Sequence, residues 1–210
     1  MSAPASRSLW LPDHPLILAS GSAARAQILA SAGIPSTVDK PNLDERAIEA
    51  PLHAAGAGGR EIAAALARAK VLEVSARHPG RHVLGGDQTL EIGDALLSKP
   101  EGAEGARAHL RLLSGRAHQL HAAAALALDG QILLTVEDHA TLTMRDLNDA
   151  FIEAYLDAAG DAVLGSVGAY QIEGLGIHLF ERVEGQHAVI MGLPLQPLIA
   201  GLRKLCLVRG

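Results

Sequence analysis

The stretch VLGGDQTLEIGDALLSKP, residues 83–100, contains two side chains whose types and spacing suggest chemistry. An apolar run leads through two glycines to Asp87, and this pattern predicts a buried strand that ends at an acid. Lys99 follows twelve positions later, beyond a predicted turn and directly before a proline. An acid and a lysine on the two sides of one turn could serve a metal ion and an anionic ligand, respectively.

Three further charged residues are candidates for the same site. Glu45 and Glu173 lie in predicted loops, and Lys70 lies on a predicted helix. In open α/β sheets, ligands bind near the ends of strands, and carboxylates there commonly hold Mg²⁺, which keeps several waters and bridges to phosphate oxygens. A metal held in this way can activate a water as a nucleophile, while lysines neutralise phosphate charge. The pattern is therefore compatible with a metal–phosphate site.

A structural role is the alternative for each of these residues, and the pattern alone leaves it open. Asp87 could cap a strand, and Glu173 could stabilise its loop. Glu45 could be a solvated acid of a surface loop, and Lys70 could lie on a solvated helix face, because charged side chains are mostly exposed.

The elements that would position these residues begin with a strand, a turn and a helix. PLILAS, residues 15–20, predicts a strand buried on both faces, and GSAARAQILASAG predicts a helix that Ser22 caps and Gly33 ends. This order places backbone N–H groups at a helix N-terminus, which favours phosphate or another anion. Most strand–helix junctions bind nothing, so this signal is weak by itself.

The rest of the chain continues the alternation of strands and helices, which argues for an α/β fold with a mixed sheet. Hairpin turns are predicted at Gly93-Asp94 and Asp129-Gly130. His118 and His121 fall on opposite faces of a predicted strand, so they show no metal spacing. The expected elements are a short strand and loop at 36–46, a flexible connection at 51–59, helices at 60–77, 101–115 and 145–161, hairpin strands at 81–100 and 117–144, a glycine-rich segment and strand at 165–185, and a strand leading into a final helix at 187–207.

Composition excludes some classes of function. With 210 residues the chain can form one large domain or two small lobes. Its net charge of −5 and its five aromatic residues disfavour nucleic-acid binding.

The single cysteine, Cys206, excludes an intrachain disulfide and is expected to be a packed thiol in an apolar pattern. The N-terminal segment is too short and too proline-broken for a signal peptide or membrane span, so we expect a cytoplasmic protein without membrane partners.

Five stretches, in this order, resemble the Maf family of septum-formation inhibitor homologues, which are nucleoside triphosphate pyrophosphatases. They are LILASGSAARAQILASAGI, NLDE, ALARAK, VLGGDQTLEIGDALLSKP with LLSGRAHQL, and GAYQIEGLGIHLFERVEGQHAVIMGLPL. Together they span residues 16–195, and the last two are the most specific.

The resemblance implies a single domain, 1–210, with two lobes around a deep cleft. It also implies hydrolysis of a nucleoside triphosphate between the α and β phosphates, giving a monophosphate and pyrophosphate. The family needs a divalent metal cation, Mg²⁺ or Mn²⁺, and is often homodimeric.

The resemblance also implies roles for individual residues. Asp87 matches the acid assigned as catalytic base and metal ligand, and Glu45 matches an acid that helps to hold the metal. Lys70 and Lys99 match two lysines that contact the phosphates during catalysis. The substrate-binding residues of the first phosphate loop match Ser20, Ser22 and Arg25.

Two positions resemble the family branch that acts on 7-methyl-GTP. They are Gln88, directly after the catalytic acid, and Glu173 in the glycine-rich loop, whose carboxylate could accept from a guanine N–H edge. Against this, Ala23 and Ala24 replace the usual proline and its neighbouring Arg or Trp, so an aromatic partner for a cationic base is missing.

Two hypotheses therefore stand. The first is a metal-dependent pyrophosphatase that clears modified or non-standard nucleotides. The second is a nucleotide-binding regulator of cell division that has lost turnover, as Ala23 and Ala24 suggest. The acids and lysines that match the family favour the enzyme, because a mere binder does not need an acid that serves metal and water.

Overall fold

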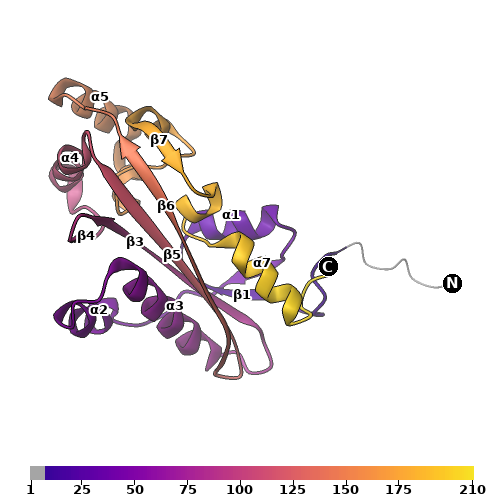
Figure 1. Ribbon diagram of the computed structural model, residues 1–210. Coiled ribbons are helices and arrows are strands. Elements are labelled where there is room, and N and C mark those ends of the chain that lie inside the picture. The colour runs from indigo at the N-terminus through magenta and orange to yellow at the C-terminus, as the bar shows by residue number, and fades with distance from the viewer. Residues whose placement is uncertain (1–7) are drawn as a thin grey trace.

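A seven-stranded mixed sheet runs through the part of the chain that the computed structural model describes, residues 8–210 (Figure 1). Its strand order is β2-β1-β3-β5-β6-β7, and β4 pairs with β3 beside this path. The strands are β1 (Leu16–Ala19), β2 (Ser36–Val38), β3 (Val83–Ile92), β4 (Ala95–Leu97), β5 (Ala117–Leu128), β6 (Gln131–Met144) and β7 (Phe180–Glu184). The predicted α/β fold with a mixed sheet is thus confirmed.

The sheet has a parallel part and an antiparallel part. β1 pairs in parallel with β2 and β3, whereas β4 to β7 add to it in antiparallel ladders. Asp129 and Gly130 join β5 to β6 with φ values of 49° and 73°, the left-handed pair that a tight hairpin requires. Gly93, at φ 59°, lies in the turn between β3 and β4, so both predicted hairpins are confirmed.

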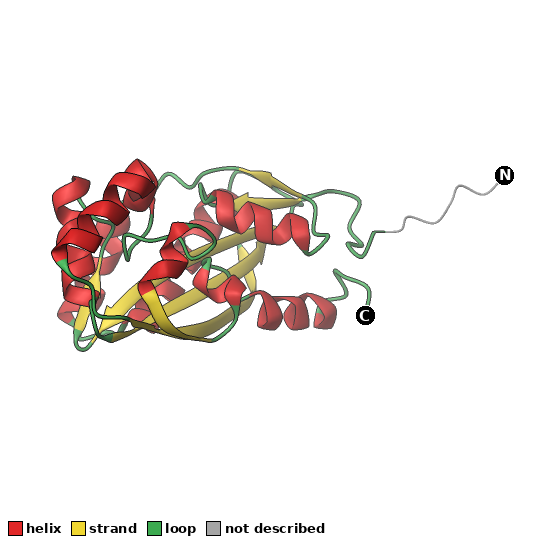
Figure 2. Ribbon diagram, turned by 90° about the horizontal axis from the view of Figure 1, so that it is seen from above, coloured by secondary structure: helices red, strands yellow, loops and turns green. Residues whose placement is uncertain are grey.

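Helices cover both faces of the sheet (Figure 2). They are α1 (Ala23–Ser31), α2 (Glu45–Ala54), α3 (Gly59–Ser75), α4 (Gly102–Leu113), α5 (Asp149–Ala159), α6 (His187–Ile190) and α7 (Leu195–Lys204), with 3₁₀ helices η1 (Gly160–Gly165) and η2 (Leu175–Leu179). On one face α3 packs through small side chains, including Ala67 and Val71, against the alanines of β5. The small residues let this helix approach the sheet closely.

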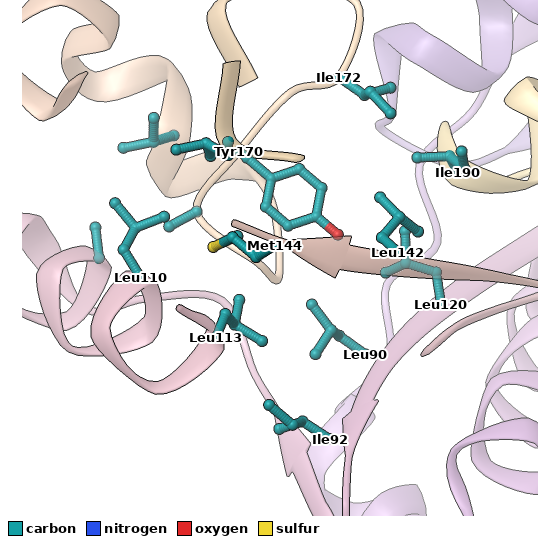
Figure 3. Packing of buried hydrophobic residues seen from close by; sticks show 14 of the residues in the cluster. Leu90, Ile92, Leu110, Leu113, Leu120, Leu142, Met144, Tyr170, Ile172 and Ile190 are labelled. Carbon is teal, nitrogen blue, oxygen red and sulfur yellow. The ribbon is translucent and has the colours of Figure 1, made fainter. Parts of the chain in front are cut away.

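The other face carries two separate hydrophobic clusters. One lies between the ends of the chain and the helices α1 and α7, and includes Leu84 and Leu126 of the sheet. The other lies under α4 and α5 around Tyr170, and includes Leu90, Leu120 and Leu142 (Figure 3). The division of the chain into two lobes around a cleft stays a prediction.

Two segments differ from the expected secondary structure. The flexible connection predicted at 51–59 is wrong at its start, because α2 continues through Pro51 to Ala54. Its alanines favour helix, and Asp44 caps it by accepting a hydrogen bond from the backbone N–H of Ala47. Residues 187–190 form the short helix α6 rather than a strand. Tertiary contacts described below override the strand propensity of Val189 and Ile190.

The prediction of a packed thiol is wrong, since Cys206 is exposed. Helix α7 ends at Lys204, and Cys206 adopts a left-handed conformation at φ 56°, which breaks the helical period that would have buried it. No helix among residues 8–210 combines the length and apolarity needed to cross a bilayer. The prediction about a signal peptide falls partly on residues 1–7, which lie outside the described residues.

Candidate active site

The candidate site lies where one edge of β3 has no neighbouring strand. β1 pairs with β3 only as far as Gly85, and β4 pairs with it only from Leu90 onward. Residues Gly86–Thr89 therefore pair on their β5 edge alone, and we call this four-residue gap the notch. Ligands of open α/β sheets bind beyond the ends of parallel strands, and the notch is the position beyond the end of β1.

Asp87 lies within the notch, but it does not end a strand. β3 continues five residues beyond it to Ile92, so the prediction of a strand-end acid is wrong for β3 itself. The strand that ends here is the neighbour, β1, whose last residue Ala19 pairs with Gly85. The local sequence could not reveal this, because it depends on the lengths of two strands that are far apart in the chain.

Lys70 joins Asp87 to Glu45. Its ammonium Nζ lies 2.5 Å from Asp87 Oδ1 and 2.9 Å from Glu45 Oε1. Lys70 and Asp87 are each only 7% exposed, whereas the Glu45 side chain is 48% exposed. Lys70 is therefore not on a solvated helix face, since the buried face of α3 includes it together with Val71.

Glu45 is the first residue of α2 rather than a loop residue, so the helix fixes its direction. Glu49 follows one turn later and is half-buried. Burial, together with the charges of Asp87 and Glu45, raises the pKa of Glu49. Glu49 was not a candidate, because Glu45 was expected to lie in the loop at 36–46 and no element was expected at 47–50. In a helix, the i, i+4 spacing of Glu45 and Glu49 indicates a shared face.

Burial is also the main influence on Asp87. It raises the pKa of this carboxyl above its ordinary value, against the opposing charges of Lys70 and Arg25 and the hydrogen bond from Lys70. An acid held in this way can exchange a proton closer to neutral pH than an exposed aspartate can.

Arg25 reaches the notch from α1. Its Nη1 donates to Ser20 Oγ at 3.0 Å, and its Nε donates to the carbonyl oxygen of Gly192 at 2.8 Å. Two glycines make room for it: a Cβ on Gly86 would lie 3.2 Å from Arg25 Nε, and one on Gly192 would lie 3.2 Å from Nη2. Burial lowers the pKa of Arg25, while Asp87 and Glu45 oppose this shift.

The two serines of the first loop lie around this arginine. Ser20 is buried, and its Oγ also accepts a hydrogen bond from the backbone N–H of Ser22 at 3.2 Å. Ser22 caps α1 as predicted, because its Oγ accepts from the backbone N–H of Arg25 at 3.3 Å. The strand, turn and helix therefore form the anion-favouring junction expected from the sequence.

Gln88 holds the short helix α6 against the notch. Its Nε2 donates to the carbonyl oxygens of Val189 and Ile190 at 2.8 and 3.0 Å. These bonds take up the last carbonyls of α6, which explains why 187–190 can be helical in spite of their strand propensity.

The structure does not bring Lys99 and Glu173 into contact with the other candidates. Both side chains are exposed, and neither forms a hydrogen bond or ion pair within residues 8–210. Lys99 nevertheless follows β4, which is antiparallel to β3 and pairs Leu97 with Leu90, so the chain leaves β4 toward the notch. Glu173 lies in the segment between Tyr170 and η2.

The predicted separation of the histidines is confirmed. His118 is buried among the residues around Tyr170 and lies 2.7 Å from its hydroxyl, whereas His121 lies on the α3 face near Glu91. Within residues 8–210 no three His, Cys, Asp or Glu side chains form a group that could hold a metal by themselves. Asp87 and Glu45 supply two hard oxygen donors around one cation position, which fits a Mg²⁺-like ion that takes its other ligands from phosphate and water.

Comparison with known proteins shows close relatives over almost the whole chain. Residues 15–205 match the family model described as Maf-like protein. The chain is 53% identical to the nucleoside triphosphate pyrophosphatase of Nitrobacter winogradskyi, over 93% of this chain and 96% of that protein. It is 50% identical to the 7-methyl-GTP pyrophosphatase of Mesorhizobium japonicum, over 93% and 98%, and 48% identical to the one of Brucella abortus, over 90% and 95%.

A solved structure is also similar at a lower level. It is the nucleoside-triphosphatase / dITP/XTP pyrophosphatase of Mycobacterium abscessus, with a TM-score of 0.40 and 14% identity over 92% of this chain and 96% of that chain. The family assignment depends on the sequence relatives and not on this structure.

Proposed function

Because this chain belongs to the Maf family, we propose that it is an enzyme that hydrolyses a nucleoside triphosphate between the α and β phosphates. The products are a nucleoside monophosphate and pyrophosphate. The observation that carries the proposal is a buried acid in the notch, Asp87, which a buried lysine joins to a second acid. The names of the relatives, nucleoside triphosphate pyrophosphatase and 7-methyl-GTP pyrophosphatase, support the same reaction.

In the proposed reaction Asp87 accepts the proton of a water that attacks phosphorus. The new P–O bond forms as the bridging P–O bond breaks, and pyrophosphate leaves. The raised pKa of Asp87 supports the role of base, because proton transfer is most effective when the pKa lies near the working pH. Lys70, Lys99 and Arg25 stabilise the charge that develops on phosphate oxygens.

The enzyme is proposed to use Mg²⁺ or Mn²⁺, held by Asp87 and Glu45. When bound, such a cation neutralises phosphate charge and lowers the pKa of a coordinated water. The two carboxylates fit this role in number and chemistry, since Mg²⁺ in nucleotide enzymes takes one or two carboxylates together with phosphates. The other residues of the site then bind and orient the triphosphate: Ser20, Ser22 and Arg25 at the junction of β1 and α1, and Lys99 beyond β4.

The preferred base is proposed to be a modified guanine such as that of 7-methyl-GTP. Gln88 and Glu173 support this choice, and two of the relatives carry that name. An exposed Glu173 carboxylate is free to meet a base, whereas the Gln88 amide nitrogen is already bound to α6. A cytoplasmic location remains an expectation from the sequence, and a homodimer remains one from the family resemblance.

Pyrophosphate release tests the proposal. The panel is 7-methyl-GTP, dTTP, UTP, CTP and GTP, each with Mg²⁺ or Mn²⁺ and with excess EDTA. Asp87→Asn should lower turnover by about 10²–10⁴-fold, whereas Asp94→Asn, on the exposed β3–β4 turn, should leave it unchanged. Loss of turnover in EDTA supports the metal. Folded protein that binds a nucleotide but turns over none of the panel would contradict the enzyme and favour the regulator of cell division.

A further inference from the structure

Lys70 occupies the position between the two acids that the proposed metal would need. We propose that Lys70 is an internal counterion. Its ammonium occupies the carboxylates of Asp87 and Glu45 while no nucleotide is bound, and it moves away from them when a triphosphate binds. The metal and the nucleotide would then bind cooperatively. This inference rests on the proposed function and concerns the regulation of the same site.

The contacts of Lys70 carry the first step. One ammonium group meets Asp87 Oδ1 at 2.5 Å and Glu45 Oε1 at 2.9 Å, so it bridges two helices and a strand through a single nitrogen. Among the described residues the Lys70 ammonium has no other hydrogen-bond or ion-pair partner. A divalent cation that takes the same two oxygens, Asp87 Oδ1 and Glu45 Oε1, would therefore displace the ammonium from both.

Burial makes this displacement costly. Lys70 is 7% exposed, and a buried charge that loses its partner is strongly disfavoured unless another partner replaces it. A triphosphate supplies such a partner, because its oxygens can accept the hydrogen bonds that the carboxylates lose. The ammonium can then move from carboxylate to phosphate as the cation takes its place.

Thermodynamic linkage makes the binding of metal and nucleotide cooperative. If the nucleotide removes the competitor of the metal, it increases the affinity for the metal, and the metal must increase the affinity for the nucleotide by the same factor. The free protein would bind a divalent cation weakly, although it contains both carboxylate ligands. This behaviour distinguishes a counterion from a lysine that only contacts phosphate.

The first test measures Mn²⁺ affinity of the nucleotide-free protein by electron paramagnetic resonance of unbound Mn²⁺. Lys70→Gln should bind Mn²⁺ about tenfold more tightly than wild type, because the competing charge is gone. Lys70→Arg, which keeps the charge, and Lys204→Gln, which removes an exposed lysine at the end of α7, should both bind as weakly as wild type. Because burial raises the pKa of Asp87, the titrations are made at pH 7, 8 and 9, so that protonation of Asp87 in Lys70→Gln is not mistaken for weak binding. Equal affinities for Lys70→Gln and wild type would overturn the proposal.

A second measurement uses the unmodified protein, in case Lys70→Gln does not fold. Acetic anhydride labels free lysine amines, and mass spectrometry follows each site. Saturating Mn²⁺ should increase the labelling rate of Lys70 several-fold relative to that of Lys99. An unchanged ratio would contradict displacement. If wild type hydrolyses a nucleotide but neither the Mn²⁺ affinity nor the labelling changes as expected, the counterion proposal is rejected and the proposed enzyme activity is kept. If both change as expected but no nucleotide is hydrolysed, the counterion proposal is kept and the enzyme activity is rejected.

Discussion

The carboxyl group of Asp87 is subject to opposing influences, and their balance can be measured. Burial raises its pKa above the ordinary value of 3.8, and the charge of Lys70 lowers it. If ionised Asp87 is the base, kcat/KM should rise with pH through a limb that lies above 3.8. Lys70→Gln removes the lowering influence, so it should move this limb to higher pH.

The measurement is kcat/KM for the best nucleotide between pH 4 and 9, in wild type and Lys70→Gln. Lys70→Arg keeps the positive charge and should leave the limb close to its wild-type position. A pH profile without an acid limb in this range, or with one that Lys70→Gln does not move, would contradict the assignment of Asp87 as base.

Arg25 combines a structural and a proposed substrate-binding function, and kinetics can separate them. Arg25→Ala removes a charge from the notch and leaves the Gly192 carbonyl without its donor. KM should rise about 10–100-fold if a charge-assisted phosphate contact is lost. The free energy of unfolding should fall by about 1–3 kcal/mol, because a buried acceptor loses its partner.

Steady-state kinetics and urea unfolding measure the two effects of Arg25→Ala. Arg111→Ala serves as the control, since it removes an exposed arginine whose ion pair with Asp149 lies on the surface and is worth little. A fall in stability with an unchanged KM would leave Arg25 only the role of connecting α1 to the turn after α6.

At the scale of elements, the distance between α3 and β3 sets the geometry of Lys70 and Asp87. A Cβ on Gly85 would lie 2.5 Å from the carbonyl oxygen of Ala67 and 2.9 Å from the backbone nitrogen of Val71. Both atoms belong to the helix backbone next to Lys70, so the helix itself must move. Gly85→Ala should therefore destabilise the fold by about 1–3 kcal/mol, as overpacking does, and reduce turnover by separating Lys70 from Asp87.

Urea unfolding and pyrophosphate release test the Gly85 variant. Gly165→Ala is a suitable control, because a Cβ there meets no atom within 4 Å and its φ is not in the left-handed region. If Gly85→Ala were as stable and as active as Gly165→Ala, α3 would not be held at the distance that the structure shows.

The elements also show what the sequence could predict. Patterns of local origin were reliable: the β5–β6 turn at Asp129-Gly130 and the cap at Ser22. Helix α2 was missed because Pro51 and the glycines after it resemble a linker, although the first turns of the helix depend on the Asp44 cap. Helix α6 was missed because a distant side chain, Gln88, stabilises it.

For the site as well, local sequence predicts the residue types, whereas their geometry depends on distant parts of the chain. Its residue types could be found from motifs, and Asp87, Lys70 and Glu45 do meet. Their mutual geometry could not be predicted, because it depends on where β1 ends relative to β3 and on which face of α3 is buried. Lys99 and Glu173, which lie on exposed segments, are the candidates whose positions a bound nucleotide would have to define.

At the scale of the whole molecule, buried and half-buried histidines should make the fold sensitive to acid. Burial lowers the pKa of His82, His109, His118 and His121, and that of His118 from 6.5 to about 4. His118 lies 2% exposed, and its Nε2 is 2.7 Å from the hydroxyl of Tyr170, which points toward Leu120 and Leu142 in Figure 3. A proton on this imidazole would be held in apolar surroundings.

The sign of the effect follows from proton linkage. Between pH 6.5 and about 4 the unfolded chain binds a proton at His118 that the folded protein does not. The stability that His118 contributes is therefore complete above pH 6.5 and is lost as the pH falls toward 4, by about 3 kcal/mol in total.

Urea unfolding at pH 7, 6, 5 and 4 should show this fall in the free energy of unfolding. His118→Gln should be less stable at pH 7, because packing is lost, but its stability should depend less on pH. The exposed His178→Gln should keep the wild-type slope, and an equal slope in His118→Gln would mean that other groups cause the acid sensitivity.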